Sequence, residues 1–179
     1  MSNVSTGTRI RQWLMTGVSH MIPFVAAGGI LIALGFLFGA VAAGTDGIHA
    51  YDAAKMSVPV DADGKITGFN LLNVGNWAFI IFWLGKAAFA FFVPVLAGYI
   101  AYAIADRPGL APGFVGGAIA GTVGAGFLGG LITGFLGGFV ALWLSRIKLP
   151  NWLRPLMPVV VIPLVATFIT AGLMLVILG

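Results

Sequence analysis

The chain has 179 residues, of which 60% are hydrophobic and 8% are charged, and its formal net charge is +4. Soluble domains contain about 25% charged residues, so this composition excludes an ordinary soluble enzyme, a disordered chain and a nucleic-acid-binding domain. The absence of cysteine excludes disulfides, thiolate catalysis and cysteine-bound metals. The class that remains is a multi-span membrane protein that lies in the lipid bilayer.

The first apolar stretch, residues 12–45, contains no charged residue. A helix needs roughly 20 apolar residues to cross about 30 Å of hydrocarbon, so the stretch predicts a transmembrane helix over Val18–Ala43. Arg9 and Arg11 lie just before it, and we expect residues 1–11 to form a cytoplasmic N-terminal segment.

Residues 44–76 have a mixed, polar composition with four aspartates and two lysines, and they predict an external loop. Within it, Asp63 and Gly64 predict the turn of a hairpin. Asp61 and Asp63 also suggest a calcium loop, but the full ligand spacing and the terminal glutamate are missing, so the turn is favoured. Three asparagines at the end of the loop could line an interfacial helix or simply face water: Asn70, Asn73 and Asn76.

The second apolar stretch, Trp77–Ala105, is interrupted by a single charge. Pro94 lies inside it and has no backbone N–H, so the carbonyl of Ala90 loses its helical partner. The stretch therefore predicts a transmembrane helix with a kink between Ala90 and Pro94.

Two ionisable residues, His20 and Lys86, belong to these spans and are the candidates for substrate binding. His20 lies near the inner end of the first span, where a place among the lipid headgroups is the simpler interpretation. If residues 87–105 cross alone, Lys86 lies near the outer interface. If Trp77 marks that interface, Lys86 lies about 14 Å deeper. No catalytic residue, cofactor site or metal site is predicted, because paired carboxylates and ligand clusters are missing.

The uncharged stretch 108–145 would be about 57 Å long as one helix, too long for a single span. Its glycines change phase at residues 122–125, which predicts a turn between a third span (about Pro108–Val123), short or re-entrant, and a fourth (about Ala125–Ser145). Glycines four residues apart permit close helix approach in lipid, so we expect seven of them to pack against neighbouring helices: Gly113, Gly117, Gly121, Gly126, Gly130, Gly134 and Gly138.

Charge placement favours this division, because cytoplasmic loops carry an excess of lysine and arginine. With two spans in 108–145, every basic segment lies on the inner side and the acidic loop lies outside. A fifth span, about Pro158–Leu178, then ends the chain outside. The prediction is an all-α, polytopic membrane helical bundle of about five transmembrane helices, with residues 1–179 as a single membrane domain. The three basic segments named above are the N-terminus with Arg9 and Arg11, the 106–109 connection with Arg107, and the 145–154 loop with Arg146, Lys148 and Arg154.

Four blocks of the chain resemble the fructose-type membrane permease (IIC) of the bacterial phosphoenolpyruvate:sugar phosphotransferase system. They are residues 14–36, 92–117, 124–136 and 141–150, and the likeness runs from about residue 10 to the end of the chain. The first block contains Gly17-Val-Ser-His-Met-Ile-Pro-Phe. The chain is thus similar to the N-terminal half of a IIC permease.

The resemblance implies a homodimer in the bacterial inner membrane that carries a sugar, with fructose favoured. It also implies that the sugar is phosphorylated on the cytoplasmic side by a IIB partner, which receives its phosphoryl group from IIA and the histidine-containing carrier protein. In related permeases the first five spans form the dimer and the scaffold. The sugar and its catalytic carboxylate lie mainly in later hairpins and spans. The family's sugar-binding glutamate motif has no counterpart here, because this chain contains no glutamate.

We therefore expect a truncated scaffold half of a fructose permease that binds sugar weakly or not at all alone. Whether it counts as an enzyme stays open, because the family takes part in sugar phosphorylation only together with IIB. The alternative is a non-transporting structural or regulatory membrane subunit. A small channel is a third possibility, but only Lys86 offers a polar pore lining.

Overall fold

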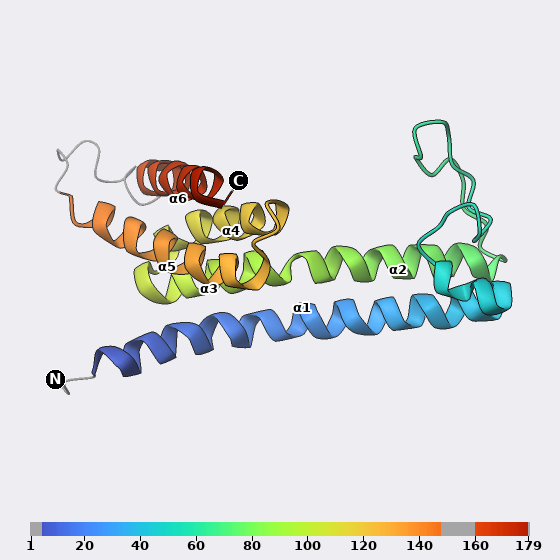
Figure 1. Cartoon of the computed structure of the whole chain (residues 1–179), viewed down its shortest axis with the longest axis horizontal. Coiled ribbons are helices and arrows are strands. Elements are labelled where there is room, and N and C mark those ends of the chain that lie inside the picture. The colour runs from blue at the N-terminus through green and yellow to red at the C-terminus, as the bar shows by residue number, and fades with distance from the viewer. Residues whose placement is uncertain (1–4, 148–159, 179) are drawn as a thin grey trace. The chain divides into compact units, whose positions relative to one another are not determined.

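The computed structural model describes residues 5–147 and 160–178, and within them all regular elements are helices apart from one isolated β-bridge (Figure 1). In this described part of the chain, three helical stretches are long and apolar enough to cross a membrane: Thr6–Ala43, Val74–Ala105 and Gly126–Ser145. The prediction of an all-α membrane helical bundle is confirmed, and the chain is a multi-pass membrane protein. The elements are α1 (Thr6–Ala43), the 3-10 helix η1 (Gly44–His49), α2 (Val74–Ala90), α3 (Phe92–Ala105), α4 (Arg107–Thr122), α5 (Gly126–Ser145) and α6 (Ile162–Leu178).

The chain divides into two compact units, which we describe separately. Unit 1 contains residues 1–22 and 90–179, that is, the first half of α1 with α3, α4, α5 and α6. Unit 2 contains residues 23–89, that is, the second half of α1, the loop after it and α2.

Helix α1 ends at Ala43 as expected but begins at Thr6, well before the predicted start at Val18. The reason is local, because the hydroxyl of Ser5 accepts a hydrogen bond from the backbone N–H of Thr8 at 3.3 Å and caps the first turn. Arg9 and Arg11 are therefore helical. The helix is 38 residues long, about 57 Å at the α-helical rise, which exceeds the hydrocarbon thickness.

The predicted kink in the second span is confirmed as a break between two helices. Helix α2 ends at Ala90, and α3 begins at Phe92. The N–H of Val95 donates to the carbonyl of Phe91 at 2.9 Å. Because Pro94 has no N–H to offer the carbonyl of Ala90, the helical ladder is interrupted at this point.

The predicted turn in 108–145 is also confirmed. Helix α4 ends at Thr122 and α5 begins at Gly126, so the stretch is two helices and not one rod. Gly124 and Gly126 have φ values of +75° and +54°, a left-handed region that side chains with a Cβ rarely adopt. The change of glycine phase in the sequence therefore coincides with the residues that reverse the chain.

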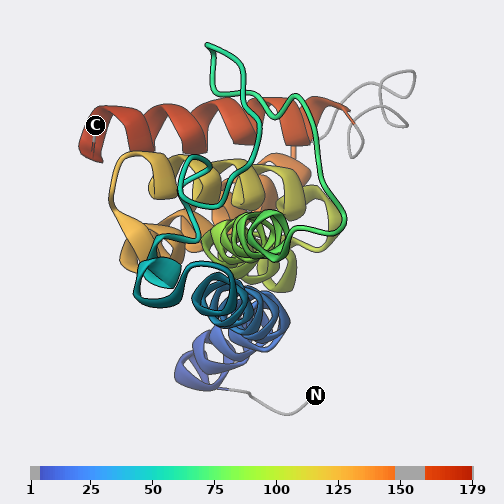
Figure 2. The same ribbon diagram turned by 90° about the vertical axis from the view of Figure 1, so that its right-hand side faces the viewer.

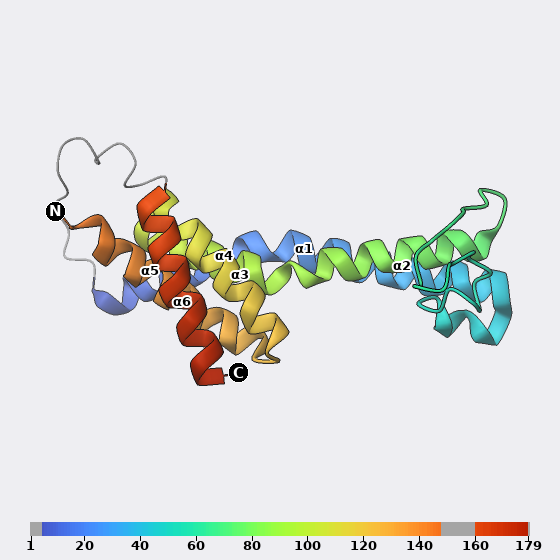
Figure 3. The same cartoon turned by 90° about the horizontal axis from the view of Figure 1, so that it is seen from above.

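In unit 1, α3 is the central helix, with α4 and α5 packed against it and against each other. Its residues Leu96, Ala97, Ile100 and Ala101 have no exposed surface. Helix α6 lies over α4 and α5 and crosses them (Figure 3). The fifth predicted span began at about Pro158, which lies outside the described residues, and α6 begins at Ile162.

In unit 2, the second half of α1 pairs with α2, and the connecting loop extends to one side of this pair (Figure 2). The loop contains the predicted hairpin, in which Val60 and Ile66 form an antiparallel bridge and Gly64 has a φ of +76°. A small core joins the loop to α2, because Met56 and Val58 are buried in one cluster with three α2 residues: Ala78, Phe79 and Phe82.

Candidate functional site

Two glycine faces hold α3 from different sides. On α4, a Cβ placed on Gly113 would lie 2.7 Å from the Ala97 carbonyl oxygen, and one on Gly117 would lie 2.8 Å from the Cα of Pro94. On α5, three glycines lie equally close to α3 residues between Val93 and Ile104: Gly130, Gly134 and Gly138. Side chains at these positions would force the helices apart, so the glycines set the interhelical distance.

The packing faces do not extend to the other two predicted glycines. A Cβ on Gly121 would meet nothing within 4 Å, and the same holds for Gly126. Gly117 lies against the first turn of α3. Gly121 is one helical turn further along α4, so it lies beyond the start of α3 and has no α3 residue to contact. Gly126 serves the turn through its positive φ.

Several close-contact glycines escaped the sequence analysis, most clearly in unit 2. A Cβ on Gly28 would lie 2.9 Å from the Gly85 carbonyl oxygen, and one on Gly35 would lie 2.9 Å from the backbone N of Phe82. The available signal was their spacing, because seven residues correspond to about two helical turns and place both glycines on one face of α1.

His20 is exposed in unit 1 and stacks on Tyr99 of α3, with ring centroids 3.8 Å apart and planes 10° from parallel. Its Nδ1 donates to the carbonyl oxygen of Thr16 at 2.8 Å, which fixes the tautomer of the neutral ring. Tyr99 in turn contacts Phe114 of α4 edge to face at 6.0 Å. Sequence reasoning selected His20 but could not identify Tyr99 as its partner, because this contact joins different helices.

Lys86 is exposed in unit 2, and its Nζ lies 4.4 Å from the ring centroid of Trp83. The indole N–H of Trp83 donates to the backbone carbonyl of Tyr51 at 3.4 Å. The ring of Tyr51 also contacts His49, whose Nδ1 lies 3.0 Å from the Tyr51 hydroxyl oxygen. Clusters of Trp, Tyr and Lys are typical of membrane–water interfaces.

The three asparagines at the end of the loop differ in exposure, because Asn70 is exposed and Asn73 is half-buried. Asn76 is fully buried. In the amide orientation that satisfies all its partners, Asn76 donates to the carbonyls of Met56 and Ser57 at 3.1 and 3.0 Å and accepts from the N–H of Asn70 at 2.9 Å. The side-chain oxygens of Asn70 and Asn73 each accept a local backbone N–H. These contacts fasten the loop to the start of α2.

The Asp61 carboxylate accepts backbone N–H groups from Asp63 at 3.1 Å and Lys65 at 2.8 Å, which is the hydrogen bonding of a turn. Within residues 5–147 and 160–178, no three side chains of His, Asp or Glu lie together in a way that could hold a metal ion.

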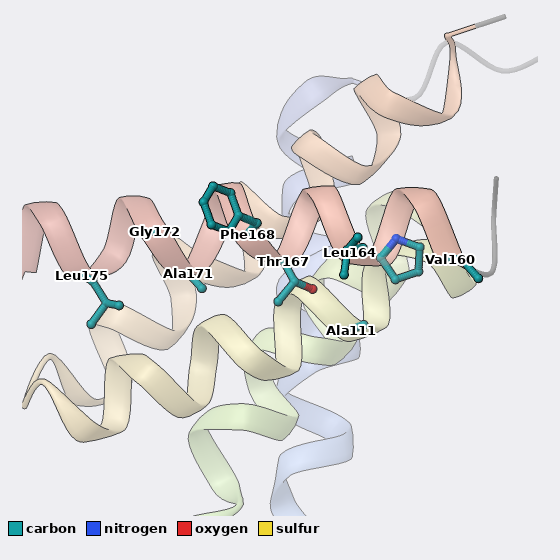
Figure 4. A pocket seen from close by; sticks show the side chains of 9 residues that line it. Ala111, Val160, Leu164, Thr167, Phe168, Ala171, Gly172 and Leu175 are labelled. Atoms are coloured by element: carbon teal, nitrogen blue, oxygen red, sulfur yellow. The ribbon is translucent and has the colours of Figure 1, made fainter. Parts of the chain in front are cut away.

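An open groove of about 700 Å³ runs along α4 and α6 in unit 1 (Figure 4). Ala111 contributes from α4, and the other lining residues come from α6 or just before it. Thr167 is the only lining residue with a polar side chain, so the groove offers an apolar surface and little hydrogen bonding. The lining residues are Ala111, Val160, Pro163, Leu164, Thr167, Phe168, Ala171, Gly172 and Leu175.

The basic residues of unit 1 gather at one end, which we call the basic end. The Trp13 ring, just after Arg11, contacts Phe139 near the end of α5 with centroids 5.8 Å apart. A Cβ on Gly138 of α5 would lie 2.8 Å from Ile104, near the end of α3. The start of α1, the end of α3, the start of α4 and the end of α5 therefore lie together, with Arg9, Arg11, Arg107 and Arg146. Lys148 and Arg154 lie outside the described residues.

The chain is 37% identical to the fructose-specific EIIC component of Haloferax volcanii over 96% of its length and 44% of that protein. It is 40% identical to the fructose-like permease IIC component 2 of Escherichia coli over 92% of the chain and 39% of that protein. It is 41% identical to the fructose-specific EIIABC component of Bacillus subtilis over 97% of the chain and 24% of that protein.

No family model matches the chain, and no solved structure matches it. The chain spans less than half the length of these three curated relatives. The similarity nevertheless covers both units and all four blocks that resembled a permease. Over nearly its whole length, the chain is therefore homologous to part of the fructose-type IIC components of the phosphotransferase system.

Proposed function

We propose that the chain is a membrane component of a phosphotransferase-system permease that imports fructose and couples its uptake to phosphorylation by a IIB partner. The observation that supports this is 37–41% identity to fructose-specific or fructose-like IIC components over 92–97% of the chain. The Bacillus subtilis relative is named as one EIIABC component, which supports IIA and IIB as partners.

In this permease, unit 1 contributes a scaffold whose helices are held at a fixed distance by the glycine contacts around α3. The proposal includes a homodimer, which the resemblance to IIC permeases implies. Light scattering of the purified protein in detergent tests the dimer, and a single-chain mass after correction for detergent would contradict it.

The gathering of arginines at the basic end supports a cytoplasmic location for the N-terminus in the bacterial inner membrane. The chain has no cysteine, so single cysteines can be labelled without background. We expect Ser145→Cys to react with a membrane-impermeant maleimide only after the cells are permeabilised, and Lys65→Cys to react in intact cells. The reverse pattern would contradict the orientation.

The function is tested by fructose uptake in a strain that lacks its own fructose permeases and expresses this chain together with the remaining spans of a fructose-type IIC component, because the chain alone is expected to bind sugar weakly or not at all. We expect uptake that depends on phosphoenolpyruvate and on IIB, with a sugar phosphate as the product. Accumulation of free fructose, or equal uptake without IIB, would contradict the coupling.

The second candidate is a non-transporting structural or regulatory subunit, which the sparse hydrogen-bonding capacity of the apolar groove supports. Such a subunit would co-purify with a complete permease and change its uptake rate without supporting uptake itself.

A further inference from the structure

The ring pair of His20 and Tyr99 is unusual because two of its polar groups, His20 Nε2 and the Tyr99 hydroxyl, have no hydrogen-bond partner within the described residues. The other polar side chains around it in α1 bond within their own helix: Thr16 donates to the carbonyl of Gln12 at 2.9 Å, and Ser19 donates to that of Met15 at 2.7 Å. Across residues 5–147 and 160–178, no hydrogen bond reaches His20 Nε2 or the hydroxyl of Tyr99.

The pair lies well away from the basic end. His20 is nine residues from Arg11, and Tyr99 is seven residues from Asp106. At the α-helical rise, the two rings therefore lie about 10–14 Å from the basic end, measured along their helices. If the basic end marks a membrane surface, this depth is close to the middle of about 30 Å of hydrocarbon. Unpaired imidazole and phenol groups at that depth are costly against lipid tails, so a polar partner is expected on this face.

The ring pair is also held in a fixed position. Stacking on Tyr99 covers one face of the His20 ring, and the Thr16 carbonyl occupies its Nδ1. Phe114 supports Tyr99 from α4, and its ring lies against Gly98, where a Cβ would collide with it. The second face of the exposed imidazole and the lone pair on Nε2 remain accessible, and Nε2 is an acceptor in this tautomer.

We propose that His20 and Tyr99 form a sugar-binding subsite, a proposal that rests on the proposed transport function. The open face of His20 packs against the C–H groups of the sugar, and Nε2 accepts a hydrogen bond from a sugar hydroxyl. The Tyr99 hydroxyl is a second group able to donate or accept. A flat ring surface combined with a few fixed polar groups suits a neutral, hydroxyl-rich ligand.

Two substitutions at His20 distinguish the contribution of Nδ1, which donates to Thr16, from that of Nε2. His20→Asn keeps a donor for the Thr16 carbonyl but has no atom at the Nε2 position. His20→Gln places its amide near the Nε2 position. We expect His20→Asn to raise the KM for fructose uptake, and the Kd for fructose of the purified permease that contains this chain, at least about fivefold, which corresponds to the loss of one hydrogen bond. His20→Gln should have the smaller effect.

Ser19→Ala is the matched control, because Ser19 is the neighbour of His20 and its hydroxyl bonds only within its own helix. It should leave both KM and Kd unchanged. Tyr99→Phe keeps the stacked ring without the hydroxyl and should weaken fructose binding, with the melting temperature measured for every variant.

If the permease that contains the unsubstituted chain takes up no fructose, the proposed function fails and the subsite fails with it. If it takes up fructose and His20→Asn has the same KM and Kd, only the subsite is overturned. The same conclusion follows if both His20 variants lower the melting temperature while fructose affinity is unchanged, since the ring pair would then be a structural contact between α1 and α3.

Discussion

Both units bring helices together through glycine, but they place it with different spacing. In unit 1 the glycines recur every fourth residue on α4 and α5 and lie against a single central helix. In unit 2 Gly28 and Gly35 are seven residues apart on α1 and face α2, where Gly85 lies against Ile32. A dense repeat is easily recognised in a sequence, whereas a sparse one has the same physical effect and is easily missed.

The largest expected effect is a bulky side chain in the unit 1 contact. Gly117→Leu would place a side chain where even a Cβ lies 2.8 Å from the Pro94 Cα and 2.9 Å from the Val93 carbonyl oxygen. Backbone atoms cannot rotate away, so we expect a loss of stability above the roughly 1–3 kcal/mol typical of overpacking. Loss of the folded protein in a detergent thermal-stability assay measures it.

Gly121→Leu is the matched control, four residues later on the same helix and with nothing within 4 Å of its Cβ position. It should change the melting temperature little. Equal behaviour of the two variants would show that the α4 face does not determine the packing of unit 1.

A smaller loss of stability is expected in unit 2, where the adjacent glycines Gly28 and Gly29 can each be replaced by alanine and compared. A Cβ on Gly28 would lie 2.8 Å from the backbone N of Phe89, whereas one on Gly29 would meet nothing within 4 Å. Gly28→Ala should therefore destabilise by about 1–3 kcal/mol. Gly29→Ala should be neutral or stabilise by up to about 1 kcal/mol through helix propensity. Thermal unfolding of both variants measures the difference, and similar melting temperatures would contradict the close contact.

The sequence was sufficient wherever one residue dictates local geometry. Pro94 predicted the break before α3, the glycine phase predicted the turn before α5, and Asp63-Gly64 predicted the hairpin. It was insufficient where structure depends on contacts between elements. Neither the partner of His20 nor the burial of Asn76 has a local signal.

The next expected loss of stability is at Asn76, whose buried amide holds the loop of unit 2 against the start of α2. Asn76→Asp keeps an acceptor for the N–H of Asn70 but places a carboxylate oxygen against the carbonyls of Met56 and Ser57. Loss of these bonds in a buried position should cost about 1–3 kcal/mol. We expect faster tryptic cleavage after Lys55 in the loop.

Asn73→Ala is the control for the loop, because it removes only one local hydrogen bond, to the N–H of Gly75. Its cleavage rate should rise less than that of Asn76→Asp. Equal rates in the two variants would mean that the buried amide does not hold the loop.

The smallest expected effect is at Lys86, and it decides between the two interpretations of that residue. If Lys86 lies at the interface over Trp83, its exposed cation–π contact contributes about 0.5–1 kcal/mol, and Lys86→Ala should destabilise by no more than this. If Lys86 lies in hydrocarbon, removing a charge that costs about 2.5–3.5 kcal/mol there should raise stability. A double-mutant cycle with Trp83→Leu, read by thermal unfolding in liposomes, isolates the pairwise coupling. A positive coupling together with a small loss in Lys86→Ala places the cation in the headgroup region, where it anchors α2 and has no contact with sugar. A gain in stability would instead return Lys86 to the set of candidate substrate-binding residues.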